Sequence, residues 1–463
     1  MIRLFRVFVP AVSLALFSSE ILLILASYVL ATYVVLTVDP TVFLLYDRGL
    51  VRILLVLASI LVGMHFHDLY SNLFVRSRRV LIQQLCLVIG VAFLVQALIG
   101  YLDATLRVPI RVMVLGSILA VPAIFAWRVF FSAYVLRVVG RDRLLLVGAS
   151  PLLEDIGKHI EDHPETGLQV VGYVRDSEEA GTAMAGGKVL GPIAALREIV
   201  QATNPDRIVV GMTERRAQMP VSELLELRFA GHIIEEAAST YEKVCGRVCL
   251  KEMRPSQLIY TGELGPRRAS MFYQTAINLI LAAIGVVAAM PLMLLIALAV
   301  RFTSAGPVLY RQVRVGMGGR PFTLYKFRSM RADAEAETGA VWASRDDPRV
   351  TPLGRTMRKL RIDEIPQLFN VLKGEMSIVG PRPERPEMVR SLAQQIPYYR
   401  HRHCVRPGIT GWAQVNYKYG DTLEDVIRKL EYDLYYIKNM SPSLDSYIIF
   451  LTIKAMLLTR GSQ

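Results

Sequence analysis

The chain has 463 residues, of which 53% are hydrophobic and 20% charged, and it carries a formal net charge of +13. This length is enough for two or three domains, and the hydrophobic balance is typical of membrane proteins. The four scattered cysteines exclude a disulfide-stapled secreted domain and agree with a reducing cytosolic environment. The positive charge suits nucleic acid, an anionic membrane surface or phosphorylated substrates, and its position must decide between them.

Four long apolar segments occupy the first third of the chain. The first, between Arg6 and Asp39, contains Glu20 as its one charge and exceeds the roughly 20 residues that cross a bilayer. A signal peptide is the alternative, but the segment is too long and shows no convincing small-residue cleavage site. The other segments cover about 50–67, 80–102 and 112–136. We therefore predict a four-helix transmembrane bundle over residues 1–140.

Arginine is distributed unequally between the two sides of this bundle. One side collects Arg3, Arg6, Arg76, Arg78, Arg79, Arg137, Arg141 and Arg143, and the other has Arg48, Arg52, Arg107 and Arg111. Positively charged loops stay on the cytoplasmic side of a membrane, and four spans return the chain to the side on which it started. We therefore expect the rest of the chain on the cytoplasmic face of a bacterial inner membrane.

Residues 141–262 show alternating strand and helix patterns. The apolar strands Arg143–Val147, Leu168–Val174 and Arg207–Val210 are separated by helical stretches, one of them starting at about Ala194. This pattern predicts a small doubly wound, Rossmann-like sheet. Its first turn lacks the G-x-G-x-x-G sequence of dinucleotide-binding sheets, so we favour a regulatory, nucleotide-sensing or oligomerisation module and expect a homodimer.

A fifth apolar segment, Ala269–Val300, has 32 residues without a charge and contains Pro291. Arg267 and Arg268 precede it and further arginines follow it, so both flanks favour the cytosol, which a straight crossing cannot satisfy. A break at Pro291, which removes a backbone donor and disfavours helix in the preceding residue, allows entry and exit on one face. We predict a re-entrant helix over about 269–300, with a plain kinked span as the alternative.

The positive charge concentrates in the last third of the chain. From Arg301 onward there are 26 Lys and Arg against 16 Asp and Glu. No zinc finger, recognition-helix pattern or aromatic RNA-binding signature accompanies this charge, so we expect no nucleic acid partner. The charge instead suits anionic lipid and phosphate groups at a membrane surface.

Four motifs follow one another in this region, and their combination is specific although each alone is weak. They are Lys326-Phe327-Arg328-Ser329-Met330, Arg361-Ile362-Asp363-Glu364-Ile365-Pro366-Gln367-Leu368-Phe369-Asn370, Gly380-Pro381-Arg382-Pro383-Glu384 and Arg406-Pro407-Gly408-Ile409-Thr410-Gly411-Trp412-Ala413-Gln414. Together they resemble the polyprenyl-phosphate hexose-1-phosphate transferases, which are phosphoglycosyl transferases with a monotopic catalytic domain. Larger members of that family begin with a four-helix bundle and a Rossmann-like domain, so the resemblance extends loosely over the whole chain.

The acidic pair Asp363 and Glu364 is the candidate catalytic centre. Pro366 suits the first turn of a helix and should push Ile365 out of helical geometry, which would leave the pair at a helix N-terminus. The family resemblance implies that Asp363 attacks the β-phosphate of a UDP-sugar and expels UMP, and that Glu364 binds Mg²⁺ as cofactor. Without the other motifs, an acidic helix start stabilised by the helix dipole would explain both residues.

Basic residues in the motifs are candidates for phosphate and nucleotide binding, because an Arg fork grips two phosphate oxygens at once. These candidates are Lys326, Arg328, Arg361 and Arg382. The Pro- and Gly-rich motifs predict rigid loops near the nucleotide, with Pro383, Glu384, Arg406 and Trp412 as further candidates. A solvated basic face is the alternative for the cations, and bracing of the fold is the alternative for the loops.

The sequence departs from the family pattern in the fifth apolar segment. The Lys-Arg-x-x-Asp that usually begins the segment is replaced by Gln274, Thr275 and Asn278, with Arg267 and Arg268 as possible substitutes upstream. The usual Ser-Pro at the break is Met290-Pro291. We expect these changes to weaken the polar anchoring of the helix and to leave the catalytic motifs unaffected.

These observations predict three parts: the membrane bundle, the Rossmann-like domain and, over residues 263–463, a mainly α-helical monotopic catalytic domain with the re-entrant helix. The resemblance implies transfer of hexose 1-phosphate from a UDP-sugar to undecaprenyl phosphate in membrane lipid, through an aspartyl-phosphosugar intermediate, at the start of exopolysaccharide or O-antigen type synthesis. The alternatives are a glycosyltransferase that releases UDP, a non-catalytic scaffold or sensor for polysaccharide assembly, and, as the weakest, a transporter.

Overall fold

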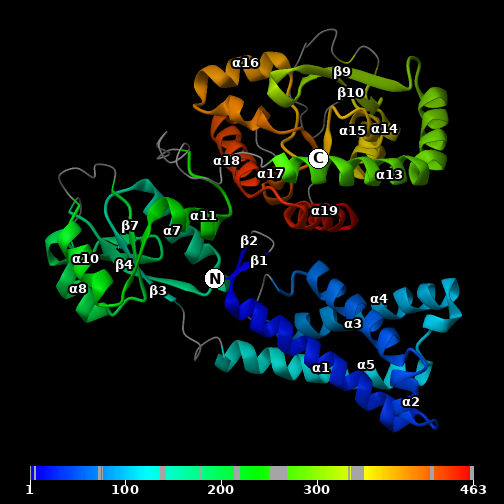
Figure 1. The fold of residues 1–463 in the computed structure, drawn as a ribbon, viewed down its shortest axis with the longest axis horizontal. Helices are drawn as coiled ribbons and strands as arrows, with labels where there is room; N and C mark the ends of the chain where they lie inside the picture. Colours follow the sequence, from blue (N-terminus) through cyan, green and yellow to red (C-terminus); the bar gives the residue numbers. More distant parts are fainter. Residues whose placement is uncertain are drawn as a thin grey trace. The chain divides into compact units, whose positions relative to one another are not determined.

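The computed structural model describes most of the chain. The described residues are 2–4, 7–70, 75, 77–135, 142–176, 180–212, 219–250, 268–331, 334, 349–417 and 422–458. They divide into two compact units, Met1–Arg3 with Phe8–Ala237 and Leu4–Val7 with Ala238–Gln463. Figure 1 shows the elements of each unit, which are described separately below.

The first unit contains the helical bundle that the apolar segments predicted. Two short strands, β1 (Ile2–Leu4) and β2 (Val7–Val9), precede it. Its helices are α1 (Ala11–Val35), the short α2 (Pro40–Leu45), α3 (Gly49–Phe66), α4 (Arg78–Leu102) and α5 (Ile110–Phe130), which continues as a π-helical turn, Phe131–Val135. Helix α1 packs along α5, and α3 packs along α4. All four long segments are long and apolar enough to cross a membrane.

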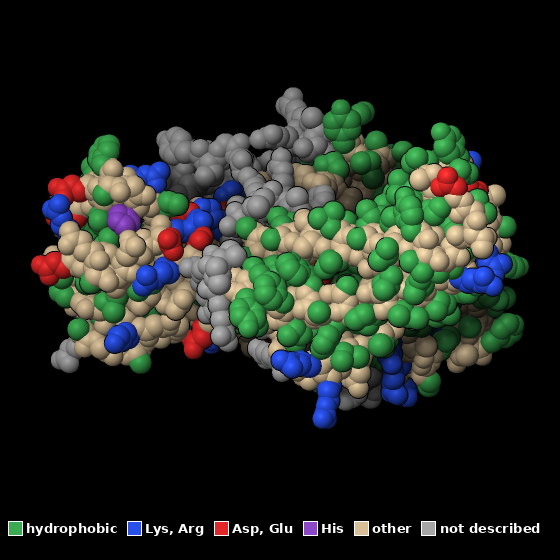
Figure 2. All heavy atoms as spheres, turned by 90° about the horizontal axis from the view of Figure 1, so that it is seen from below, with side chains coloured by type: hydrophobic (Ala, Val, Ile, Leu, Met, Phe, Trp, Pro, Cys, Tyr) green, Lys and Arg blue, Asp and Glu red, His purple; other side chains and the backbone are tan. Residues whose placement is uncertain are grey.

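The outer surface of this bundle is hydrophobic. Figure 2 shows apolar side chains spread over it, with charged side chains gathered at its edges. Leu22, Leu94 and Ile118 are each more than half exposed, although each lies in the middle part of a long helix. A water-soluble helix would bury such residues, so the surface is suited to contact with lipid hydrocarbon.

Glu20 and Arg128 form a buried ion pair in the interior of the bundle. Arg128 Nε lies 2.6 Å from Glu20 Oε1, and the side chains are 3% and 0% exposed. Arg128 also donates to the carbonyl of Leu69 at 2.8 Å, and its guanidinium lies over the ring of Tyr70. The two charges that interrupt the first and fourth apolar segments therefore neutralise one another, as polar groups inside a membrane generally must.

The same unit contains the predicted doubly wound sheet. Its strand order is β5-β6-β4-β3-β7-β8. The strands are β3 (Asp142–Val147), β4 (Leu168–Val174), β5 (Ala183–Met184), β6 (Gly187–Gly191), β7 (Arg207–Val210) and β8 (Ile233–Glu236). Strand β3 lies between parallel neighbours β4 and β7, so the chain order reverses there. Helices α7 (Pro151–Asp162), α8 (Leu196–Thr203) and α10 (Val221–Phe229) connect strands of the sheet.

The second unit is mainly helical and has two small sheets. Its helices are α11 (Ala237–Cys245), α13 (Arg268–Thr303), α14 (Pro352–Lys359), α15 (Gln367–Leu372), α16 (Pro386–Gln395), α17 (Trp412–Asn416), α18 (Leu423–Asn439) and α19 (Pro442–Leu457). The antiparallel strands β9 (Leu309–Val315) and β10 (Pro321–Phe327) form one sheet, and the parallel strands β11 (Ser377–Val379) and β12 (Gly408–Thr410) form the other. Residues of α18 form much of the buried core.

Helix α13 corrects one prediction. The sequence predicted two helices separated by a break at Pro291, but α13 is one assigned helix of 36 residues with Pro291 inside it. Figure 1 shows α13 changing direction along its length. A proline removes one backbone hydrogen bond and bends a helix without having to end it, and Met290 therefore remains helical.

Both halves of α13 pack against other elements of the second unit. In the first half, Asn278 Nδ2 donates to Ser377 Oγ at 2.8 Å. In the second half, Val300 belongs to a buried apolar cluster with Phe327 and Met357. The helix is thus bound to the same domain on each side of its proline.

Candidate active site

The acidic motif lies in a tight turn between α14 and α15. Arg361 has a left-handed backbone with φ of 55°, which reverses the chain after α14, and a 3₁₀ turn, Ile362–Glu364, follows. Buried Asn370 on α15 then fixes this segment to β10. Its Nδ2 donates to the carbonyl of Thr323 at 2.7 Å, and its Oδ1 accepts from the amide of Tyr325 at 3.1 Å.

The local geometry corrects a second expectation. Ile365 was predicted to leave the helical region because it precedes Pro366, but its φ and ψ are −55° and −38°. Pro366 itself is also helical and comes directly before α15. The preference of a residue before proline is therefore overridden here, where the 3₁₀ turn runs straight into α15. The acidic pair still lies immediately before a helix, as predicted.

Glu364 is held by two cations from different motifs. Its Oε1 lies 2.8 Å from Lys326 Nζ and 3.3 Å from Arg382 Nη2. Burial opposes ionisation of Glu364, but the positive charges of Lys326 and Arg382 outweigh burial and hold its pKa well below the usual range. The charge of Arg361 acts in the same direction. Glu364 is therefore an anion at every physiological pH.

Asp363 is in the opposite situation. It is 7% exposed, and no residue that the structure describes donates a hydrogen bond to its carboxylate. Burial, and then the negative charge of Glu364, raise the pKa of Asp363, although Lys326, Arg358 and Arg382 oppose the shift. A carboxylate that is buried without hydrogen bonds keeps its lone pairs available for reaction and is more basic than an ordinary aspartate.

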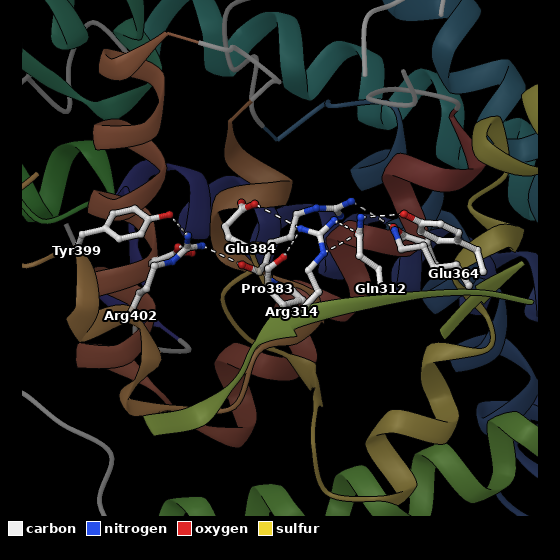
Figure 3. Close-up of polar contacts among 11 residues, drawn as sticks. Gln312, Arg314, Glu364, Pro383, Glu384, Tyr399 and Arg402 are labelled. Atoms are coloured by element: carbon white, nitrogen blue, oxygen red, sulfur yellow. Dashed lines mark hydrogen bonds and ion pairs between the residues drawn. The ribbon is translucent and has the colours of Figure 1, made fainter. Parts of the chain in front are cut away.

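The loop that carries Arg382 is fixed at three consecutive carbonyl groups. The carbonyl of Arg382 accepts from Arg402 at 3.0 Å, that of Pro383 from Arg314 at 3.0 Å, and that of Glu384 from the amide of Val315 at 2.9 Å. Figure 3 shows Arg402 and Arg314 reaching the loop from different elements. Successive carbonyls bound in this way leave the backbone little freedom, so Arg382 is presented to Glu364 by a rigid loop.

The arginines that grip the loop are themselves fixed. Arg402 forms a buried ion pair with Asp433 of α18, 2.7 Å away, and donates to Tyr399 Oη at 2.8 Å. Arg314 lies 3.6 Å from the Glu384 carboxylate. Sequence reasoning did not single out Arg314 or Arg402, because each lies outside the motifs and nothing in the sequence indicates which loop it reaches.

Two predicted binding residues lie in the framework and not beside the acidic pair. Arg406 donates to Thr275 Oγ1 on α13 at 2.6 Å. Trp412 is buried, donates to the carbonyl of Gly246 at 2.8 Å and stacks on Tyr435. These contacts agree with the alternative that the fourth motif braces the fold.

Arg328 lies near the end of α13. Its Nη2 donates to both the carbonyl and the hydroxyl of Ser304 at 2.7 Å. It follows Lys326 by two residues, yet its hydrogen bonds go to Ser304 and not to Glu364. Of the predicted cations, Lys326 and Arg382 therefore contact the acidic pair directly.

The polar residues of α13 anchor the helix, contrary to the expected weakening. Gln274 donates to Tyr436 Oη at 2.8 Å and to Asp445 Oδ2 at 2.9 Å. Thr275 accepts from Arg406, and Asn278 binds β11 as described above. Neutral side chains of α13 thus hold the helix, in part through hydrogen bonds with the charged side chains of Asp445 and Arg406. Arg267 and the side chain of Arg268, the suggested substitutes, lie outside the described residues.

The acidic pair is chemically suited to Mg²⁺. Among the described residues, no group of three or more His, Cys, Asp or Glu side chains could hold a metal ion. Mg²⁺ is nevertheless commonly bound by one or two carboxylates, water and substrate phosphates. Glu364 Oε2 receives no hydrogen bond from the described part of the chain, and Asp363 is adjacent, so hard oxygen ligands are present for such an ion.

Comparison with known proteins places this site in a family. A family model described as bacterial sugar transferase matches residues 269–459. The chain is 45% identical over 222 residues to a UDP-N-acetylgalactosamine-undecaprenyl-phosphate N-acetylgalactosaminephosphotransferase of Aeromonas hydrophila; the match covers 48% of this chain and 52% of the relative, about half of its length.

Two further relatives are named UDP-glucose:undecaprenyl-phosphate glucose-1-phosphate transferase. The protein of Xanthomonas campestris pv. campestris is 34% identical over 337 residues, which cover 68% of this chain and 67% of the relative. That of Caulobacter vibrioides is 38% identical over 213 residues, which cover 45% of this chain and 79% of the relative. These matches confirm the resemblance that the four motifs predicted: the chain belongs to the bacterial sugar transferase family.

Proposed function

We propose that this protein transfers a sugar 1-phosphate from a UDP-sugar to undecaprenyl phosphate and releases UMP. The names of its relatives support the acceptor and the class of reaction. The observation that carries the proposal is the contrast within the acidic pair: Lys326 and Arg382 bind Glu364, whereas Asp363 remains a buried carboxylate with raised pKa that receives no hydrogen bond from the described residues. Such a group is suited to nucleophilic attack.

In the first step, an oxygen of the Asp363 carboxylate attacks the β-phosphorus of the donor. A bond forms between this oxygen and phosphorus, and the bond from phosphorus to the oxygen bridging the two phosphates breaks. The electron pair leaves with that bridging oxygen as part of UMP, and the sugar phosphate remains on Asp363 as an acyl phosphate. Lys326 and Arg382 offset negative charge on the transferred group.

Glu364 and the donor phosphates would hold Mg²⁺, with Asp363 adjacent. When bound, the ion supplies positive charge that screens the repulsion between carboxylate and pyrophosphate. The protein contributes the orientation of Glu364, because Lys326 and Arg382 fix one of its oxygens and leave the other for a ligand.

In the second step, a phosphate oxygen of undecaprenyl phosphate attacks the same phosphorus. The bond to the Asp363 oxygen breaks, and the carboxylate is regenerated. The product carries two phosphates between lipid and sugar, which would initiate a lipid-linked glycan of the exopolysaccharide or O-antigen type.

The nucleotide product tests this reaction. Purified full-length protein, Mg²⁺, undecaprenyl phosphate and a panel of UDP-sugars should yield UMP with at least one donor. Release of UDP would instead indicate the rival glycosyltransferase, which transfers the sugar alone. No nucleotide release with any donor would favour the non-catalytic scaffold.

We further propose that α13 enters and leaves the membrane on the cytoplasmic face. Contacts of its first half through Asn278 and of its second half through Val300 with one domain support this topology, as do the basic flanks. Cysteines introduced as Ala269→Cys and Ala305→Cys in a variant without the native cysteines should both react with a membrane-impermeant reagent added to the cytoplasmic side. Reaction of one of them from the opposite side would indicate a plain crossing.

The cytoplasmic location on a bacterial inner membrane and the homodimer are parts of the same proposal. The arginine distribution of the bundle supports the location. The homodimer rests on the additional Rossmann-like domain. A mass measurement of the protein in lipid nanodiscs should give twice the mass of one chain, and the mass of one chain would contradict the dimer.

A further inference from the structure

Arg328 is a buried cation with incomplete bonding. Its side chain is 5% exposed, and one nitrogen, Nη2, donates to Ser304. The other two nitrogens, Nε and Nη1, are shielded from solvent and have no hydrogen-bond partner. No carboxylate in the described part of the chain lies within ion-pair distance of it. The N–H groups of Nε and Nη1 therefore donate neither to water nor to another described residue.

This arrangement is unfavourable unless an anion joins it. A buried charge without a counter-charge is strongly destabilising, and each unsatisfied buried donor adds to that cost. A phosphate monoester combines negative charge with several acceptor oxygens, so it can supply the missing counter-charge and accept a charge-assisted hydrogen bond from an unpartnered guanidinium nitrogen. We propose that Arg328, held by Ser304, forms a second phosphate subsite that takes the phosphate of the lipid acceptor. This inference rests on the proposed function.

The position of Ser304 favours a phosphate attached to a hydrocarbon chain. Ser304 follows α13, and the last turns of that helix expose Leu295, Leu298 and Phe302, which are 65%, 55% and 84% exposed. Such an apolar surface is suited to lipid, so a group bound where it ends lies at the depth of lipid headgroups. A soluble nucleotide would gain nothing from this surface.

The donor phosphates have a different place in the site. Lys326 and Arg382 contact Glu364 directly, and together with Arg358 and Arg361 they are the cations with the largest effects on the pKa values of the acidic pair. Arg328 is not among these groups. Lys326 and Arg328 are only two residues apart, or about 7 Å along an extended chain. The acceptor phosphate would thus lie beside the phosphosugar without occupying its position.

Measuring the donor and acceptor half-reactions separately distinguishes binding of the donor phosphates from binding of the acceptor phosphate. Exchange of labelled UMP into UDP-sugar, without acceptor, reports the donor half-reaction, and steady-state turnover at varied undecaprenyl phosphate reports the acceptor. For Arg328→Gln we expect exchange within about twofold of the unsubstituted protein and an acceptor KM raised about 10- to 100-fold, the range for loss of charge-assisted hydrogen bonds. Arg320→Gln, at an exposed arginine between β9 and β10, is the matched control and should change neither quantity.

Other outcomes would overturn the subsite. An equal loss of exchange and turnover in a folded Arg328→Gln variant would assign Arg328 to the donor phosphates, and an unchanged acceptor KM would leave it a structural residue. Should Arg328→Gln fail to fold, Arg328→Lys keeps the charge and loses the planar guanidinium with its separate donors. The subsite then predicts a raised acceptor KM with normal exchange, and an unchanged KM contradicts it.

A binding measurement keeps the inference separate from the proposed reaction. Farnesyl phosphate, as a short lipid phosphate, should bind the unsubstituted protein more tightly than inorganic phosphate does, and Arg328→Gln should weaken its binding at least tenfold. This result would support the subsite even if no donor yielded UMP, the outcome that defeats the proposed function. Equal displacement of farnesyl phosphate by nanodiscs containing phosphatidylglycerol would instead indicate a general headgroup site and overturn the acceptor assignment.

Discussion

The transmembrane bundle and the catalytic domain both bury ionised side chains, but they satisfy them differently. In the bundle, Glu20 and Arg128 form a matched pair, and Arg128 is further bound to the carbonyl of Leu69. In the catalytic domain, two cations bind Glu364, whereas Asp363 receives no hydrogen bond from the described residues. An ion pair in which both charges are neutralised is suited to holding helices together. A buried carboxylate without such a partner is suited to taking part in a reaction.

The largest effect is expected when the charge of Asp363 is removed. Asp363→Asn should reduce UMP formation by about 10⁴-fold or more, because the amide cannot form the acyl phosphate, while the protein remains in the membrane. Turnover with a defined donor and acceptor measures the loss. Asp162→Asn, at an exposed acid of α7, is the matched control and should retain activity. Full turnover by Asp363→Asn would favour the scaffold alternative.

The bundle pair should behave in the opposite way. Glu20→Gln leaves Arg128 buried without its counter-charge, and removal of one partner of a buried pair typically costs about 3–5 kcal/mol. We expect a lower thermal unfolding midpoint for the membrane-inserted protein and unchanged UMP formation per folded molecule. A loss of activity without a loss of stability would show that the pair also serves the reaction.

Neighbouring acids should have opposite effects on stability. Because the pKa of Glu364 is lowered on folding, its ionised form stabilises the fold above its unfolded pKa, and this contribution is lost as the pH falls. The pKa of Asp363 is raised, so its stabilising contribution is present in acid and lost as the pH rises through the raised value.

At pH 7, Glu364→Gln should therefore destabilise the catalytic domain by about 1–3 kcal/mol, the cost of leaving buried donors without a charged partner. Asp363→Asn should leave stability unchanged or raise it. Unfolding midpoints of both variants between pH 4 and pH 8 measure this difference. Equal destabilisation by both substitutions would mean that the surrounding residues stabilise both carboxylates to the same extent, which contradicts the comparison.

The loop that presents Arg382 offers a smaller test. Arg402→Lys keeps the charge beside Asp433 but cannot bind Tyr399 and the Arg382 carbonyl with one planar fork. We expect the donor KM to rise several-fold, up to about tenfold, with a smaller change in kcat. Arg428→Lys, at a more exposed arginine of α18, is the control. A several-fold fall of kcat with an unchanged donor KM would contradict a role of Arg402 in positioning Arg382.

The smallest effect concerns the pH profile. Since burial and Glu364 raise the pKa of Asp363, the acidic limb of kcat/KM should lie above pH 4, where an ordinary aspartate titrates. Activity should increase with pH through this limb as the carboxylate ionises. A limb at or below pH 4 would contradict a raised pKa of Asp363 in the free enzyme.

Much of this organisation could be predicted from the sequence because it depends on local patterns. Uncharged segments predicted the membrane helices, alternating apolar strands predicted the sheet around β3, and the four motifs indicated Lys326, Arg382 and the acidic pair as candidate site residues. These signals are strong because hydrophobic period and residue type act over short stretches. Asp363 and Glu364 are consecutive residues, so their proximity also follows directly from the sequence.

Long-range pairing could not be predicted in the same way. Nothing local to Arg314 or Arg402 indicates that their side chains bind consecutive carbonyls of a distant loop. The bend at Pro291 was predicted as a break because a single proline is compatible with either outcome, and tertiary packing determines which occurs. Arg406 and Trp412 have motif positions typical of binding, yet their partners are in the framework.

The central claim is that the Asp363 carboxylate becomes covalently phosphorylated by the donor. Full-length protein incubated with Mg²⁺ and its UDP-sugar, without acceptor, then quenched and digested, can be analysed by mass spectrometry of the peptide that contains Asp363. The account predicts an added mass of one sugar phosphate at Asp363, which disappears when undecaprenyl phosphate is supplied. UMP formation with acceptor present, but without this adduct in either condition, would indicate direct transfer and contradict the account.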